Sequence, residues 1–230
     1  MKFFEGIIEL LTNDKYMGML FEGLGLTILI SIFAALIGLI LGTIVAMVGI
    51  SKSNKFTIVP KAICKAYVTI IRGTPMALQL FIMAYVIFAI KGFPREITAI
   101  VAFGFNSGAY VAENIRGGIM SVDIGQTEAG RSLGLPSIVV LWKIVIPQAI
   151  KNVIPAIGNE LIALIKETSI VSMIGMFDLT QAATIIGSGN NMATYIVPTA
   201  VAACFYLALV YLLTFAIKII EKRLRSSDKR

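Results

Sequence analysis

The sequence predicts an all-α integral membrane protein, with five membrane-spanning helices in a single domain that covers residues 1–230. Three observations support this fold class. Of the 230 residues, 57% are hydrophobic and only 14% are charged, whereas soluble domains carry about 25% charged residues. Apolar runs long enough to cross a bilayer recur along the chain, and basic residues collect at the ends of these runs, as they do in membrane proteins.

The expected spans follow from these apolar runs. The first is the clearest, because residues 23–51 carry no charge and a helix of that length exceeds the hydrocarbon core of about 30 Å. Within it, Gly38 and Gly42 form a GxxxG pair, which reflects either close helix packing or chance. The fourth is interrupted by Pro155 and Glu160, so it must line an aqueous path or a protein interface. We expect spans over residues 18–51, 56–90, 96–116, 144–166 and 191–218.

The charge distribution predicts how the chain is oriented. Lysines crowd the turn over residues 52–65, and further basic residues occupy the loop over 116–151 and the C-terminal tail. The positive-inside rule makes this side cytoplasmic, with the N-terminus outside and the C-terminus in the cytoplasm. Residues 1–15 resemble a retained amphipathic helix at the membrane interface. Residues 166–191 are broken by polar residues and glycines, which predicts an irregular or re-entrant segment.

A polar stretch over residues 121–147 lies between two apolar segments and is too hydrophilic for lipid. Asp123 is suited to cap a helix that ends before Gly134, because aspartate favours the N-cap and glycine the position after the last turn. A second helix starts at Leu135-Pro136, where proline is tolerated in the first turn. The stretch therefore predicts a helix-turn-helix on the cytoplasmic side that serves as a docking element.

The sequence lacks residues that several classes of protein usually require. The chain has no histidine, no GxSxG motif and no GxxxxGK[ST] phosphate loop, which argues against an intramembrane hydrolase and against ATPase activity. Cys64 and Cys204 carry no motif, and we expect no catalytic residue and no metal site. The net charge of +7 belongs to loop anchors and does not indicate nucleic-acid binding. A secondary transporter would need more spans or a visible inverted repeat.

The polar stretch also carries a spaced motif. Glu128-Ala129-Gly130 is followed by three residues, Gly134, nine residues, and Ile144-Val145-Ile146-Pro147. This arrangement resembles the EAA loop of ABC importer permeases, with Gly130 in place of the second alanine and Ile146 in place of a leucine. Three further stretches are similar to the polar amino acid branch of these permeases, namely residues 72–75, 107–130 and 147–175.

The resemblance implies a type I ABC importer permease fold, with the EAA loop (about residues 121–147) as a cytoplasmic coupling helix. Its implied partners are a cytoplasmic ABC ATPase dimer that binds ATP and magnesium, a second permease copy or related chain, an extracellular amino acid-binding protein, and the lipid of the bacterial inner membrane. The permease itself would bind no cofactor. The residues expected to couple it to the ATPase are Glu128, Ala129, Gly130, Arg131 and Gly134.

The fourth span supplies the residues expected to bind substrate, namely Asn159, Glu160, Ala163 and Glu167, which share one helical face. An ionised Glu160 in mid-span is costly unless it meets water or a cation, which favours a cationic amino acid such as arginine, lysine or histidine. Glutamine or another neutral amino acid is an alternative, since an α-ammonium would suffice. Another alternative is that Glu160 forms a structural ion pair with Lys151 or with an arginine.

Residues 72–75 form the expected hinge, Arg72, Gly73, Thr74 and Pro75, because proline and glycine release backbone groups there. The alternative is an interfacial kink anchored by Arg72. Glu113 and Arg116 are three apart on a helix and are expected to pair with each other.

Overall fold

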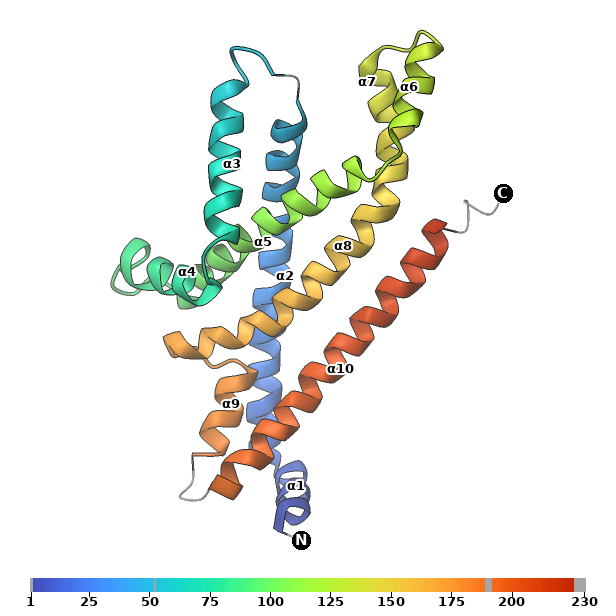
Figure 1. Ribbon diagram of the computed structural model, residues 1–230. Coiled ribbons are helices and arrows are strands. Elements are labelled where there is room, and N and C mark those ends of the chain that lie inside the picture. The colour runs from blue at the N-terminus through green and yellow to red at the C-terminus, as the bar shows by residue number, and fades with distance from the viewer. Residues whose placement is uncertain (1, 52, 189–191, 226–230) are drawn as a thin grey trace. The chain divides into compact units, whose positions relative to one another are not determined.

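The fold was obtained as a computed structural model that describes residues 2–51, 53–188 and 192–225. These residues form helices joined by short turns, with no strand among them (Figure 1). In chain order the α-helices are α1 (Lys2–Thr12), α2 (Asp14–Ile50), α3 (Ile58–Arg72), α4 (Met76–Ile82), α5 (Arg95–Met120), α6 (Ile124–Ser132), α7 (Ser137–Val140), α8 (Ile146–Glu167), α9 (Leu179–Ile186) and α10 (Met192–Arg225). Two π-helical segments, η1 (Met83–Ile87) and η2 (Leu141–Val145), and a 3-10 helix, η3 (Thr168–Ile174), lie between them.

The chain folds into two compact units, each made of three segments. The first unit contains Met1–Leu36, Pro75–Gly104 and Ile162–Leu212, and the second contains Ile37–Thr74, Phe105–Leu161 and Leu213–Arg230. Four of the five passages from one unit to the other fall inside the helices α2, α5, α8 and α10. The fifth passage falls between Thr74 and Pro75, where no helix is continuous.

The core of the first unit joins helices that are far apart in the sequence. Leu10 of α1, Leu20 of α2, Leu179 of α9, and Val197 and Val201 of α10 are all buried in one apolar cluster. Helix α1 is therefore present where an amphipathic helix was predicted, and part of its apolar face packs on this core instead of on lipid alone.

Residues 166–188 are more regular than predicted, because η3 and α9 form where the sequence indicated irregular structure. The Asp178 carboxylate caps α9 by accepting hydrogen bonds from the backbone N–H of Thr180 and Gln181, both at 3.0 Å. The Leu179 N–H donates to Oγ1 of Thr27 on α2 at 3.3 Å. This cap stabilises α9, a short helix that the sequence did not predict because polar residues interrupt the segment. The end of the predicted irregular segment, residues 189–191, lies outside the described residues.

In the second unit, the GxxxG pair of α2 packs closely on α5. A Cβ added to Gly38 would lie 2.8 Å from the Ser107 side chain, and one added to Gly42 would lie 2.7 Å from that of Val111. Neither position can take a larger side chain without moving its neighbour. Of the two interpretations of Gly38 and Gly42, close helix packing is therefore confirmed.

Within the described residues, three helical stretches are long and apolar enough to cross a membrane: Asp14–Ile50, Ser137–Ile174 and Tyr195–Leu224. The pair α3 and α4–η1 together is a fourth candidate, interrupted by a break. The third predicted span lies on α5, which is long enough at 26 residues but less apolar, because it carries Asn106, Ser107 and Glu113. The side chains of Asn106 and Ser107 are buried in protein, so this helix does not need to be apolar on every face.

Candidate functional site

The predicted helix-turn-helix is a compact hairpin of α6 and α7 at the start of α8 (Figure 1). Asp123 caps α6 as predicted, because its side chain accepts a hydrogen bond from the Gly125 N–H at 2.7 Å. At the other end Gly134 has φ +78°, a conformation that glycine adopts without strain. The N–H of Gly134 donates to the Arg131 carbonyl and the N–H of Leu135 to the Gly130 carbonyl, which is the Schellman pattern of helix ends.

Gly130 allows the two arms of the hairpin to pack closely. It is buried, and a Cβ added to it would lie 2.9 Å from both Val140 Cγ2 and Ile144 Cδ1. The glycine that replaces the second alanine of the EAA pattern thus allows α6 to lie directly against α7 and η2. An alanine at this position would require Val140 and Ile144 to move.

The outer surface of the hairpin mixes charge with apolar side chains. Glu128, Ala129 and Arg131 are exposed on α6, and Gly134 is exposed in the turn. Leu133, which lies beside Gly134, is 81% exposed, and Ile124 at the start of α6 is 70% exposed. The surface of α6 and the turn after it therefore carries both charged and apolar side chains. The sequence pattern identified the charges but did not single out Leu133 or Ile124.

Polar side chains fasten the hairpin to its neighbours in the second unit. Asn152 of α8 donates to the Ser121 hydroxyl at 2.9 Å, and Gln148 of α8 donates to Gln126 of α6 at 3.3 Å. Gly118 of α5 approaches α8 so closely that an added Cβ would lie 2.3 Å from Val153 Cγ2. These contacts attach the hairpin to α8 and bring α8 directly against α5.

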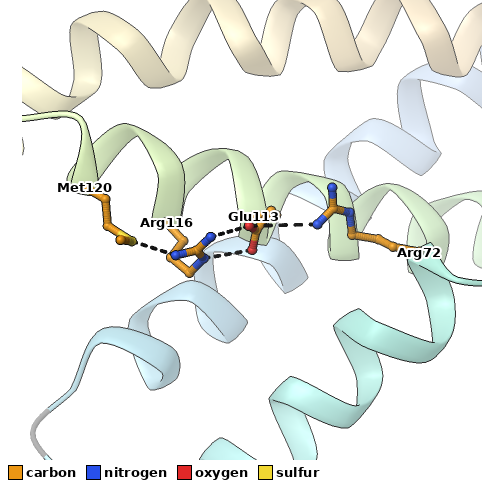
Figure 2. A network of polar contacts seen from close by, with 4 residues as sticks. All are labelled: Arg72, Glu113, Arg116 and Met120. Atoms are coloured by element: carbon orange, nitrogen blue, oxygen red, sulfur yellow. Dashed lines mark hydrogen bonds and ion pairs between the residues drawn. The ribbon is translucent and has the colours of Figure 1, made fainter.

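A second group of polar residues joins the end of α3 to α5 (Figure 2). Arg116 binds Glu113 with both a terminal nitrogen and Nε, the latter at 2.9 Å, so the predicted pair is confirmed. Arg72 approaches the same carboxylate at 3.9 Å, and its guanidinium lies 5.2 Å from the centre of the Tyr110 ring. Arg72 is thus attached to α5 by an ion pair and a cation–π contact.

The predicted second span, residues 56–90, is not one helix. Helix α3 ends at Arg72, and α4 begins after Pro75, which has ψ 137° and is followed by Met76. Proline disfavours the α-helical conformation in the preceding residue and cannot donate a backbone hydrogen bond, which favours a helix end at this point. The Thr74 hydroxyl donates to the Ile70 carbonyl at 2.9 Å and satisfies an acceptor at the helix end.

The four residues expected to bind substrate all lie on α8. Asn159 and Glu167 are exposed, and Glu160 and Ala163 are half-buried. Asn159 and Glu160 belong to the second unit, whereas Ala163 and Glu167 belong to the first. Gly158 of the same helix allows close packing on α10, since an added Cβ would lie 2.8 Å from Ile217.

Comparison with known proteins gives a family. Residues 38–226 match the family described as binding-protein-dependent transport system inner membrane component. The chain belongs to this family. The matched residues include both the α6–α7 hairpin and the Arg72–Glu113–Arg116 network. Together with the relatives described below, this match confirms the resemblance to amino acid ABC importer permeases.

Relatives of this permease are similar over nearly their whole length. The arginine transport system permease protein ArtQ of Bacillus subtilis (strain 168) is 40% identical over 209 residues, which cover 90% of this chain and 93% of ArtQ. The putative glutamine transport system permease protein GlnP of Rickettsia bellii (strain RML369-C) is 40% identical over 206 residues, covering 88% and 91%. A solved structure described as an amino acid ABC transporter with histidines is 37% identical, with a TM-score of 0.83 and coverage of 93% and 98%.

Proposed function

We propose that this permease moves a polar, cationic amino acid into the cytoplasm by alternating access, driven by separate ATPase subunits. Five spans cross the bacterial inner membrane in this proposal, with α3 and α4–η1 together forming the second and α5 the third. The N-terminus is outside and the C-terminus is cytoplasmic, which places the α6–α7 hairpin on the cytoplasmic side.

The hairpin is the observation that carries this function. Its outer face offers Glu128, Arg131 and Leu133 to a partner, while its inner face is locked by Gly130 and by polar bonds to α8. A rigid element with an exposed face can transmit the closing motion of an ATPase dimer to α5 and α8. The coupling surface consists of Glu128, Ala129, Gly130, Arg131 and Gly134, with the buried Gly130 supporting it from inside.

Glu160 supports a cationic substrate. A carboxylate in the middle of a span needs water or a cation, and Asn159, Ala163 and Glu167 share its helical face. One relative is named for arginine, which agrees with this choice, and another is named for glutamine. The second candidate is therefore a glutamine permease, in which the α-ammonium group meets Glu160.

Residues 72–75 act as a hinge in this proposal. Residues 73–75 lie between α3 and α4 and outside both helices, so a change of their backbone dihedral angles redirects the chain without breaking a helix. Arg72 keeps α3 attached to α5 through Glu113 and Tyr110 while the chain beyond Pro75 moves.

The partners follow from the same proposal. Five spans do not enclose a path alone, so a second copy or a related permease completes it. An ATPase dimer supplies ATP and magnesium, and an extracellular amino acid-binding protein delivers the substrate. The permease itself holds no cofactor.

The coupling surface is tested by replacing Arg131 with alanine in the full chain and measuring the affinity of the purified permease for its ATPase. We expect at least a tenfold weaker affinity, about 1.4 kcal/mol, because a charged contact to the partner is lost. Ser132→Ala, which alters an exposed neighbour on the same helix, is the control and should bind as the wild type does. Unchanged affinity for Arg131→Ala and Glu128→Ala would contradict the proposed docking surface.

A further inference from the structure

A cavity of about 540 Å³ lies in the second unit between the end of α2, helix α3 and the end of α5. Its walls are small and apolar, with Val45 and Ala46 from α2 and Ala112 from α5. Gly49, one turn further along α2, has no side chain to fill the space, and an added Cβ there would meet nothing within 4 Å. Small residues on opposite walls thus leave an apolar slot that none of the described residues fills.

One side of this slot is basic. Lys61, Lys65 and Arg72 lie on one face of α3 at intervals of four and seven residues, and Arg116 faces the slot from α5. Glu113 is the single carboxylate in the lining, and it is already bound by Arg72 and Arg116. The lining therefore carries four cations and one anion, a formal charge of +3.

The two lysines are not neutralised by carboxylates in the part of the chain that the structure describes. Lys61 donates to the backbone carbonyl of Ser51, a neutral acceptor that leaves its positive charge uncompensated. Lys65 is exposed at the mouth of the slot, one helical turn from Lys61. Two ammonium groups so placed can hold one phosphate between them as its counter-ions.

We propose that this slot binds an anionic phospholipid, with the phosphate at Lys61 and Lys65 and an acyl chain along Val45, Ala46 and Val68. A basic end joined to an apolar wall matches a lipid, which carries both features in one molecule, whereas a free anion would use only the basic end. Basic pockets between spanning helices on the cytoplasmic side suit anionic headgroups. The site is distinct from the substrate residues on α8, since its net positive charge repels a cationic amino acid.

The proposed lipid site rests on the same cytoplasmic orientation as the proposed function, but the test of this site does not measure transport. The full chain, assembled with its ATPase, is purified with phosphatidylglycerol, and the lipid retained per permease chain is counted by native mass spectrometry. We expect one retained phosphatidylglycerol per chain and at least tenfold less phosphatidylcholine, since the net charge of the lipid is what the lysines recognise.

Gly49→Leu tests the slot without changing any charge, because the new side chain points into open space and fills the position of the acyl chain. Gly25→Leu is the matched control, because Gly25 also lies on α2 with nothing within 4 Å of an added Cβ and does not line the slot. We expect Gly49→Leu and the double variant Lys61→Gln/Lys65→Gln each to reduce phosphatidylglycerol retention at least tenfold, and Gly25→Leu to leave it unchanged.

Three results would overturn the assignment. Retention that survives Gly49→Leu would place the lipid elsewhere. Equal retention of phosphatidylcholine would remove the role of charge. Displacement of the lipid by millimolar inorganic phosphate would make the slot a site for a soluble anion. None of these results bears on the affinity of Arg131→Ala for the ATPase, so the two proposals fail separately.

Discussion

Asp178 is a buried acidic residue in the segment between α8 and α10. Its carboxylate has no exposed surface, caps α9 and accepts a hydrogen bond from the Tyr206 hydroxyl at 3.4 Å. Burial raises the pKa of this carboxyl above its ordinary value, although the N–H bonds from Gln181 and Thr180 oppose the shift. The folded protein therefore holds a proton on Asp178 more tightly than the unfolded chain does.

This shift predicts the pH dependence of Asp178→Asn. Because the pKa of Asp178 is raised in the folded protein, the stability falls as the pH rises from the ordinary aspartate pKa of about 3.9 through the folded value. Over this range the buried carboxyl loses its proton and becomes charged. Asparagine keeps the cap and cannot ionise. We expect the thermal midpoint of the wild type in detergent to fall relative to that of Asp178→Asn as pH rises through this window. A wild type that instead gains stability relative to the variant would contradict the assignment.

At the residue scale, the sequence reveals caps whose partners are close in the chain. Asp123 and Gly134 could be predicted because each acts within the hairpin, through bonds to neighbouring backbone groups. The role of Asp178 could not be predicted in full, because α9 is also fixed by Thr27, which is 152 residues from Leu179. The stacking of Arg72 on Tyr110 likewise needs two helices to be placed.

At the scale of elements, two adjacent glycines test how α5 meets α8. Gly118 is buried, and a Cβ there would lie 2.3 Å from Val153, whereas one on Gly117 would meet nothing within 4 Å. We expect Gly118→Leu to reduce the free energy of unfolding by about 1–3 kcal/mol through overpacking. Gly117→Leu should be neutral or slightly stabilising, because leucine favours a helix more than glycine does. Thermal unfolding of both variants in the same detergent would measure the difference, and equal losses would show that α5 and α8 do not pack at Gly118.

Most long helices were predictable because apolar runs and flanking charges mark them. Helices α2, α8 and α10 lie in the regions expected for the spans over 18–51, 144–166 and 191–218, although α10 continues to Arg225. The break after Arg72 was visible as a proline and a glycine, yet the apolar content of residues 76–90 still suggested one span. The hydrophobicity of a segment indicates whether lipid or protein can surround it, but it does not indicate where a helix ends.

At the scale of the whole molecule, the hairpin that carries the EAA pattern was more predictable than a substrate path. The EAA pattern has fixed spacing because it forms one small hairpin, so residues from 123 to 147 identify it locally. A substrate path depends on side chains from several helices and from a second permease chain. Glu160 was singled out only by the energetic cost of a charge within a span, and a single sequence does not show how a second permease chain would complete the path.

In the proposed function, ATP hydrolysis by a partner, transmitted through the α6–α7 hairpin, drives uptake of a cationic amino acid. The most direct measurement is the uptake of labelled arginine into proteoliposomes that contain the assembled transporter and the binding protein. We predict accumulation only when ATP is supplied on the side of the hairpin. Glu160→Gln should slow it at least tenfold, because the carboxylate that meets the substrate cation is lost. Accumulation by the permease alone without ATP would contradict this account, and an unchanged rate for Glu160→Gln would remove Glu160 from the substrate path.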